Sequence, residues 1–306
     1  MSSSESLDRT GLGAAVACYL MWGVFPLFFH QMGVRGASPW EIVGWRTVFA
    51  APISAALVIW AGQGGALLNI VRTPKRLAML ALSALMIGVN WTVYVWAVDK
   101  GQTLSASLGY YINPLVNAAV GAWIFREPIS RAGRWALGLA TVGVVVQAAA
   151  LGAPPWVALM LAASFAGYGI VRKRVQADAQ VGLLVECLLL APFAVMLLGA
   201  LSRGPGLSFG KGFDITALLL FCGPMTVAPL SLFAVAARRL PLNIVGFIQF
   251  LTPTLQFACG LAQGERLTLP SLIAFCFIWT GAAIFAVDLV KRLRRESAAE
   301  KVARAS

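Results

Sequence analysis

Charged side chains and histidines are scarce in this sequence. Of its 306 residues, 12% are charged and one is a histidine, His30, whereas 59% are hydrophobic. A soluble domain carries roughly twice that share of charge. The composition therefore excludes a soluble globular protein and indicates one embedded in a lipid bilayer. One histidine also leaves the chain without the imidazole clusters that many metal sites use, and we expect no metal and no cofactor.

Signatures of catalysis and redox chemistry are also missing. Five cysteines lie in apolar segments without a CxxC pair: Cys18, Cys187, Cys222, Cys259 and Cys276. We interpret them as small core residues and not as disulfides or metal ligands. The sequence has no GxxxxGK[ST] motif, so we expect no ATP hydrolysis. A membrane-embedded enzyme would need a nucleophile with a base, a metal cluster or paired carboxylates. We find none of these patterns and expect that the chain is not an enzyme.

Long apolar runs dominate the sequence. Runs of about 17 to 25 residues recur, and each is long enough to cross a hydrocarbon core of roughly 30 Å as an α-helix. Ten such runs cover residues 12–29, 42–61, 77–98, 104–125, 135–151, 155–171, 181–201, 214–237, 243–261 and 269–289. The sequence therefore predicts an all-α integral membrane protein with ten transmembrane helices. The segment between the second and third runs predicts a flexible connection, GQGGALLNIVRTPKR.

Basic residues are distributed unevenly between the predicted loops. With the N-terminus placed in the cytoplasm, the cytoplasmic segments hold most of the 24 lysines and arginines, and Arg46 alone falls inside a span. This bias follows the positive-inside rule and predicts that both termini are cytoplasmic. Topology thus explains the net charge of +12, and we expect no nucleic-acid partner.

Residues 90–131 carry unusual polar side chains for a membrane segment. Two apolar runs there contain uncharged hydrogen-bonding groups and a proline: Asn90, Tyr94, Tyr110, Tyr111, Asn113, Asn117 and Pro114. Hydrocarbon tolerates a proline and several amides only where neighbouring helices or a water-filled cavity satisfy the polar groups. We interpret this stretch as the lining of a central cavity.

The second half of the sequence repeats the first. Pro114 and Asn117 match Pro253 and Gln256 at an offset of 139 residues. Each half holds five spans, an odd number, so the second copy must enter the membrane from the opposite side, which predicts an inverted 5+5 repeat. Such repeats bind substrate near the midplane between the halves. The predicted parts are a cytoplasmic tail (1–11), a first five-helix repeat (12–151), a second five-helix repeat (155–289) and a basic cytoplasmic tail (290–306).

Two charged residues lie within the predicted spans. Arg46 lies one to two turns inside the apolar boundary, where it either reaches the outer headgroups or faces the interior as a ligand or gate residue. Glu186 is the one carboxylate well inside an apolar run, where an unpaired charge is costly. It is either a structural carboxylate bonded to neighbouring groups or a proton-coupling site. The inverted topology puts Arg46 and Glu186 near opposite faces, so we do not expect them to pair.

Three prolines are candidates for interrupting helices. Pro26 follows Trp22 and Gly23 in the first span, where it either helps packing or forms a gating kink. Pro114 and Pro253 hold corresponding positions in the two halves. Interrupted helices in corresponding positions point to the substrate site of repeat-built transporters.

Several sequence blocks resemble one family of membrane proteins: MWGVFPLFF, EIVGWR, NWTVYVWAV, SLGYYINPL and FREPISR. SLGYYINPL is the most specific of them. With these blocks, the chain resembles the RarD branch of the EamA-type transporters, in the drug/metabolite transporter superfamily, over essentially its whole length. The resemblance implies ten helices in an inverted 5+5 arrangement, a central cavity between the halves, and export of small molecules across the bacterial cytoplasmic membrane.

We therefore expect a secondary transporter that moves small metabolites, amino-acid-like or amphipathic drug-like solutes, outward by alternating access. The predicted cavity lining comes from both halves: Trp22, Asn90, Tyr94, Tyr110, Asn113, Asn117, Ser231, Gln249, Thr252 and Gln256. Glu186 is the first candidate for proton coupling. The sequence leaves open an importer, an uncoupled facilitator, and a non-transporting sensor or assembly partner. It does not name the substrate, and it leaves open whether the chain forms a homodimer.

Overall fold

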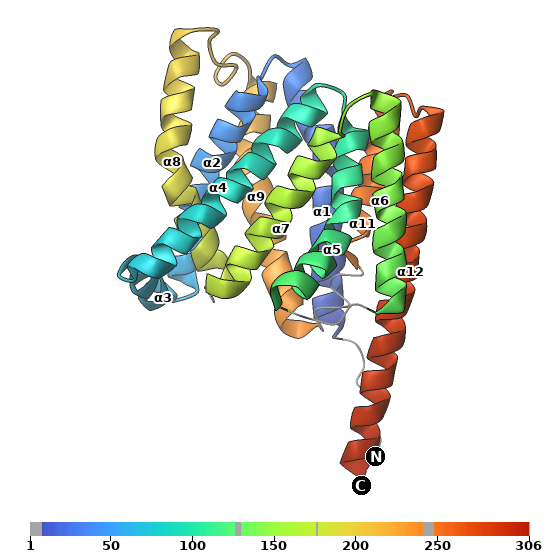
Figure 1. Ribbon diagram of the computed structural model, residues 1–306. Coiled ribbons are helices and arrows are strands. Elements are labelled where there is room, and N and C mark those ends of the chain that lie inside the picture. Colours follow the sequence, from blue (N-terminus) through green and yellow to red (C-terminus); the bar gives the residue numbers. More distant parts are fainter. Residues whose placement is uncertain (1–7, 126–129, 176, 241–247, 306) are drawn as a thin grey trace.

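The computed structural model describes residues 8–125, 130–175, 177–240 and 248–305, and within these residues all regular structure is helical. The helices are α1 (Arg9–Val34), α2 (Pro39–Trp60), α3 (Gly64–Val71), α4 (Pro74–Asp99), α5 (Thr103–Phe125), α6 (Arg131–Leu151), α7 (Trp156–Val175), α8 (Ala179–Arg203), α9 (Phe213–Arg239), α11 (Leu251–Ala262) and α12 (Leu269–Ala305). The long helices alternate in direction, so α1 begins and α12 ends at the same, lower end of the bundle (Figure 1).

Most of these helices have the length and composition of membrane spans. Seven helices in the described ranges are long and apolar enough to cross a bilayer: those of α1, α2, α4, α6, α8, α9 and α12. Large apolar side chains such as Ile59, Trp60, Phe193 and Phe213 are strongly exposed on the outside of the bundle. Broad exposed apolar surface marks a membrane-facing protein. The prediction of an all-α, multi-pass membrane protein is confirmed.

Local sequence signals fix where several helices begin. The carboxylate of Asp8 accepts hydrogen bonds from the backbone N–H groups of Thr10 (2.9 Å) and Gly11 (3.1 Å) at the start of α1. The bond from Gly11 is the main reason why the pKa of Asp8 lies below its usual value. Ser38 and Ser130 cap α2 and α6 in the same way. Such caps satisfy donors that the first helical turn leaves free.

The connection between α2 and α4 is helical, so the prediction of a flexible connection is wrong for α3. Ile70 of α3 is buried, and Ala66 and Leu67 pack against the same apolar cluster, which includes Val58 and Leu80. One face of the ALLNIV segment is thus covered by its neighbours. Burial of an apolar face stabilises a short helix that would not persist alone in water.

Long helices pack in pairs that approach closely. α6 lies along α12, and α2 lies along α8. A Cβ at Gly143 would come within 2.8 Å of the carbonyl oxygen of Ala274, and a Cβ at Gly281 within 2.8 Å of that of Ala136. These glycines let the backbones of α6 and α12 touch, which is a common basis of helix association in membranes.

An aromatic cluster occupies the centre of the bundle. Phe25 and Phe29 of α1 pack with Tyr94 of α4 and with Leu219 and Cys222 of α9. Helices from distant parts of the chain thus meet at one place. The candidate functional site is built on this cluster.

Two carboxylates fasten connections at the upper end of the bundle in Figure 1. Glu41 of α2 is buried, and its Oε1 accepts hydrogen bonds from the backbone N–H groups of Ser208 (2.8 Å) and Phe209 (2.9 Å), between α8 and α9. Glu265, between α11 and α12, accepts hydrogen bonds from the first two backbone N–H groups of α5. We call these contacts the Glu41 latch and the Glu265 latch.

Candidate functional site

Asn90 of α4 joins α5 and α7 through its side-chain amide. Its Nδ2 donates to the carbonyl of Leu161 (3.1 Å) and to the hydroxyl of Ser164 (3.0 Å). Its Oδ1 accepts a hydrogen bond from the hydroxyl of Tyr110 (3.0 Å). The structure therefore brings two predicted lining residues, Asn90 and Tyr110, into direct contact. Both ends of the Asn90 amide are satisfied by protein.

Tyr94 and Asn113, also predicted to line the cavity, keep polar atoms without partners. The Tyr94 ring packs edge-on against Phe29 and Tyr110, with centroids 5.9 and 5.6 Å away. The Tyr94 hydroxyl and both amide atoms of Asn113 make no hydrogen bond to the described protein, although the two residues are 4% and 0% exposed. An unsatisfied buried polar group costs about 1–3 kcal/mol. Native proteins keep few such groups, and each calls for an explanation.

Arg46 of α2 faces the interior of the bundle, which excludes the alternative that it reaches the headgroups. It is 5% exposed, and its Nε donates to the hydroxyl of Thr226 on α9 (2.8 Å). Its guanidinium carbon lies 4.3 Å from the ring centroid of Trp91 and 5.8 Å from those of Phe25 and Phe29. No carboxylate in the described ranges lies within ion-pair distance of it. Of the two predicted positions for Arg46, the structure has the interior one.

The aromatic rings explain how Arg46 is tolerated at this depth. Insertion scales give about 2.5–3.5 kcal/mol for an arginine at the centre of a membrane helix. A desolvated cation–π contact returns about 2 kcal/mol. The Trp91 ring thus offsets much of the cost without using the terminal N–H groups of Arg46. We call Arg46, Trp91, Tyr94 and Tyr110 the central cluster.

Thr252 and Gln256 of α11 bind the backbone of α1. The Thr252 hydroxyl donates to the carbonyl of Tyr19 (2.9 Å), and Nε2 of Gln256 donates to the carbonyl of Trp22 (3.3 Å). Pro26, four residues after Trp22, has no N–H, so the Trp22 carbonyl lacks its usual helical donor. Gln256 supplies the missing donor. These predicted lining residues therefore serve the contact between α1 and α11.

The three prolines lie in different local settings. The helical backbone continues through Pro26 in α1 and through Pro114 in α5. Pro253 is the third residue of α11, where a backbone N–H has no intrahelical partner and proline is tolerated. Gln249 lies in the turn directly before α11. The side chains of Pro114 and Asn117 lie outside the described part of the structure.

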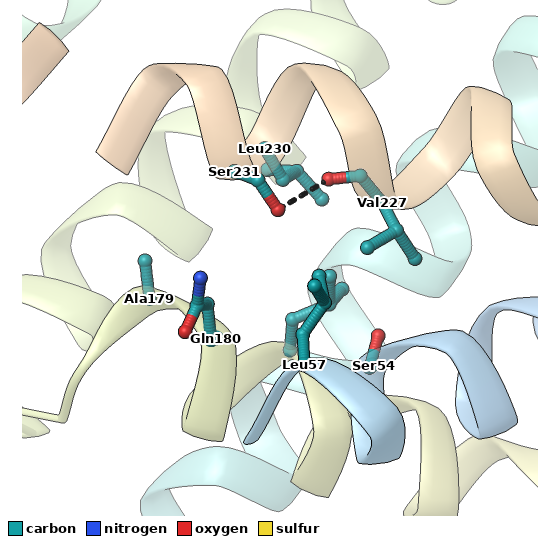
Figure 2. Close-up of a pocket in the computed structure, with 8 residues that line it drawn as sticks. Ser54, Leu57, Ala179, Gln180, Val227, Leu230 and Ser231 are labelled. Atoms are coloured by element: carbon teal, nitrogen blue, oxygen red, sulfur yellow. Dashed lines mark hydrogen bonds between the residues drawn. The ribbon is translucent and has the colours of Figure 1, made fainter. Parts of the chain in front are cut away.

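Ser231 of α9 lines a small pocket between α2, α8 and α9 (Figure 2). Its hydroxyl donates to the carbonyl of Val227 in its own helix (2.9 Å). Ser54 and Gln180 lie across the pocket, whose volume is about 10 Å³. Such a volume holds about one water molecule. This pocket is too small for a metabolite.

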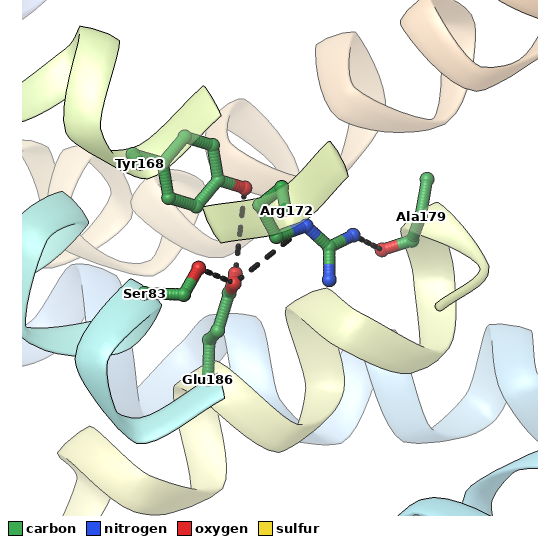
Figure 3. Close-up of polar contacts among 5 residues, drawn as sticks. All are labelled: Ser83, Tyr168, Arg172, Ala179 and Glu186. Atoms are coloured by element: carbon green, nitrogen blue, oxygen red, sulfur yellow. Dashed lines mark hydrogen bonds and ion pairs between the residues drawn. The ribbon is translucent and has the colours of Figure 1, made fainter. Parts of the chain in front are cut away.

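Glu186 of α8 is 1% exposed and is held by three side chains (Figure 3). The Ser83 hydroxyl donates to Oε1, and the Tyr168 hydroxyl donates to Oε2 (3.4 Å). Nε of Arg172 lies 3.7 Å from Oε1, and Nη2 of Arg172 donates to the carbonyl of Ala179 (3.4 Å). Buried carboxylates persist when they are paired and hydrogen-bonded in this way. As expected, the described ion pair of Glu186 is with Arg172 and not with Arg46.

Sequence reasoning missed the partners of Glu186. Arg172 belongs to a basic run that the positive-inside rule assigns to a cytoplasmic loop, but in the structure it continues α7. Tyr168 and Arg172 are four residues apart, a spacing that puts two side chains on one helix face. Tyr168 and Arg172 on one face of α7 could therefore have been predicted as partners of Glu186, the lone carboxylate of the next apolar helix.

A larger cavity lies between α2, α4 and α8, with a volume of about 600 Å³. Its lining is almost wholly apolar and includes Gly88 and two threonines, Thr47 and Thr92. Both threonine hydroxyls donate to carbonyls of their own helices. None of the predicted lining residues contributes to this cavity. The central cluster and Asn113 lie outside the lining of this cavity.

The central cluster consists of hydrogen-bonding and aromatic side chains. The described residues contain no group of three or more His, Cys, Asp or Glu side chains that would hold a metal ion. What the cluster presents is one cation, two phenols and an indole face. These are groups that orient a polar solute through hydrogen bonds and stacking.

Comparison with known proteins identifies the family of the chain. The model of the EamA-like transporter family matches residues 9–148. An uncharacterized transporter of Vibrio cholerae serotype O1 is 36% identical over 95% of this chain and 96% of that protein. The protein RarD of Escherichia coli strain K12 is 38% identical over 94% of this chain and 98% of that protein.

One crystal structure has the same fold. It is 18% identical, with a TM-score of 0.63, and the match covers 94% of this chain and 100% of that chain. The predicted resemblance is confirmed by the nearly full-length identities to the relatives. The chain is a member of the EamA-like transporter family, a homologue of the RarD proteins within the drug/metabolite transporter superfamily.

Proposed function

We propose that this member of the family is a secondary transporter that moves small metabolites, amino-acid-like or amphipathic drug-like solutes, outward by alternating access. Family membership supplies the class of transporter. Within the chain, the proposal depends on the buried hydroxyl of Tyr94 and the buried amide of Asn113, which have no partner in the described protein. Polar groups at such depth mark solute pathways because they are otherwise costly.

Ten spans in two inverted halves, residues 12–151 and 155–289, would give this transporter its two states. Helix contacts support this arrangement. α1 packs on α9 as α7 packs on α4, and α1 packs on α11 as α7 packs on α5. α1 and α7 run in opposite directions (Figure 1). Halves of this kind rock against each other around a substrate site between them.

We place the lower end of the bundle in Figure 1 in the cytoplasm, together with both termini. Arg72, Lys75 and Arg76 lie at the α3–α4 connection, and Arg131 and Arg134 lie in the first turns of α6. All five belong to this end. An excess of lysine and arginine on one side favours the cytoplasmic side. Outward transport then runs from this end toward the two latches.

Glu186 is our candidate for proton coupling. It is the membrane carboxylate whose described partners include two hydroxyls, those of Ser83 and Tyr168. A hydroxyl both donates and accepts hydrogen bonds, so these partners can hold the carboxyl with or without its proton. Arg172 would compensate the charge of the deprotonated form.

Flux in proteoliposomes tests the proposal. The purified protein is reconstituted and given a mixed panel of amino acids and small amphipathic drugs, and movement is measured by mass spectrometry with and without a pH gradient. We expect saturable flux that Asn113→Ala lowers several-fold. Because neither amide atom of Asn113 has a described partner, this variant should keep its thermal stability. Asn69→Ala, at an exposed asparagine of α3, is the control and should change neither property.

The same assay separates the alternatives. If no panel member moves in any condition, the transporter proposal is contradicted and a sensor or assembly partner is favoured. If solute moves down its own concentration gradient and a pH gradient of either sign leaves this flux unchanged, the chain is an uncoupled facilitator. If net flux runs from the latch end to the basic end, it is an importer.

A further inference from the structure

The terminal nitrogens of Arg46 are the largest group of unused donors in the central cluster. A guanidinium has five N–H donors. One, on Nε, donates to Thr226. The four on Nη1 and Nη2 make no hydrogen bond to any part of the chain that the structure describes. An arginine whose role is only to join α2 and α9 would be expected to use more of its Nη1 and Nη2 donors.

The groups around Arg46 supply no negative charge. α1 contributes the rings of Phe25 and Phe29, and α4 contributes those of Trp91 and Tyr94. Other ionisable groups in this region include a phenol and two thiols: Tyr110 of α5, Cys187 of α8 and Cys222 of α9. None of these is a carboxylic acid. The described protein thus leaves the positive charge uncompensated at short range.

The hydroxyl of Tyr94 is the second observation that points to a ligand. It is buried and has no partner among the described residues, and the Tyr94 ring packs against Phe29, over whose ring the guanidinium of Arg46 also lies. A phenol and a guanidinium both donate hydrogen bonds. Two donors on either side of Phe29, with no acceptor from the described residues, point to an acceptor from elsewhere.

We propose that Arg46 binds a carboxylate of the transported solute, with Tyr94 as a second donor and the aromatic rings around the apolar part of the solute. This inference rests on the proposed function and names the substrate class of that site. Planar guanidinium groups bind carboxylates through two parallel hydrogen bonds. The described contacts of Arg46 include no lysine or second arginine, so one positive charge matches one negative charge. A phosphate dianion would leave excess charge in hydrocarbon surroundings.

The proposal predicts that solutes of equal shape are separated by charge. 3-Phenylpropionate and 3-phenylpropionamide differ in the carboxylate alone. The acid should stabilise the purified wild-type protein against thermal unfolding and should be transported, and the amide should do neither at the same concentration. This comparison needs no variant, so it stands even if changes at Arg46 impair folding.

Variants assign the effect to Arg46. Arg46→Met keeps the length of the side chain and removes the charge, so the acid should no longer stabilise the protein. Arg46→Lys keeps the charge but loses the planar guanidinium group. The acid concentration that gives half of the maximal stabilisation should therefore rise at least tenfold. Arg35→Met, at an exposed arginine bonded to Gln31, is the matched control and should respond as the wild type does.

Binding and flux together distinguish the two proposals. If the acid stabilises the protein through Arg46 but nothing is transported, the carboxylate site stands and the transport proposal fails. If acid and amide stabilise the protein and move equally, transport stands and the carboxylate site is overturned. The carboxylate site is also overturned if Arg46→Met still responds to the acid, or if the acid does not stabilise the wild type at all.

Discussion

Glu41 and Glu186 are buried to the same degree but are held by different kinds of donor. Glu41 accepts hydrogen bonds from the backbone N–H groups of Ser208 and Phe209 and from the indole of Trp45. Glu186 is held by two hydroxyls and a guanidinium. Backbone N–H and indole groups only donate, which suits a fixed carboxylate. Hydroxyls also accept, which suits a carboxyl that exchanges a proton.

Glu41→Gln should loosen the connection between α8 and α9. A glutamine has one acceptor oxygen, and its NH₂ group would face backbone donors. Hydrogen bonds to a charged group contribute about 1.5–3 kcal/mol, so the open form of the connection should become at least about tenfold more populated. We expect trypsin to cleave after Lys211, which is exposed, correspondingly faster. Asp214→Asn, at an exposed carboxylate nearby, should leave the cleavage rate unchanged.

Glu186→Gln should uncouple transport from the pH gradient. The amide keeps hydrogen-bonding capacity toward Ser83 and Tyr168 but carries no exchangeable carboxyl proton. Flux driven by the solute gradient alone should persist, and its acceleration by a pH gradient should disappear. Proteoliposome flux at matched and opposed pH measures both. A variant that still responds fully to the gradient removes Glu186 from coupling, and Asp214→Asn again serves as the control.

At the scale of residues, the sequence was informative about which polar groups are buried and less so about their partners. Tyr110 and Asn90 could be grouped because they lie in neighbouring spans. Arg172 could not be paired with Glu186, because a basic run at a span end has an adequate explanation in topology alone. Glu41 lies at the first turn of its span, where an acidic residue is ordinary. Only tertiary contact shows that its partners come from the other half.

At the scale of elements, the contact between α1 and α11 replaces the backbone hydrogen bond that Pro26 removes from α1. Gln256→Leu should lower the free energy of unfolding by about 1–2 kcal/mol, because the Trp22 carbonyl would lose its donor. In a Pro26→Ala background, the new N–H of residue 26 can bond to that carbonyl. The cost of Gln256→Leu should then fall below about 0.5 kcal/mol, a coupling that a double-mutant cycle measures. An equal cost in both backgrounds would contradict this explanation.

Helix positions followed well from hydropathy, because a membrane helix must satisfy its own backbone and cover the hydrocarbon. The second predicted span, 42–61, overlaps almost all of α2, Pro39–Trp60. α3 was missed because eight residues are too few for a periodic signal. The bonds from α11 to α1 were missed for another reason. They supply a donor to the Trp22 carbonyl, and this pairing can be recognised only when α1 and α11 are placed side by side.

At the scale of the whole molecule, the proposed orientation has a direct test. Cys276, the one exposed cysteine in the described ranges, is first replaced by alanine. Asn69→Cys in α3 and Ser202→Cys near the end of α8 then place exposed, uncharged positions at opposite ends of the bundle. In intact cells, a membrane-impermeant maleimide should label Cys introduced at 202 and not at 69, and broken cells should label both. The reverse pattern would invert the proposed topology.

Hydrogen exchange at the backbone amides of the two latches would report the opening of the bundle. Glu41 lies in one proposed half and binds amides of the other, and Glu265 does the reverse. If the halves separate at this end as rigid bodies, both sets of amide hydrogens are released in one event. Deuterium should then enter residues 208–209 and 103–104 together, as a single correlated step in mass spectra. The rate of that step would measure the frequency with which the bundle opens at the end that carries the two latches.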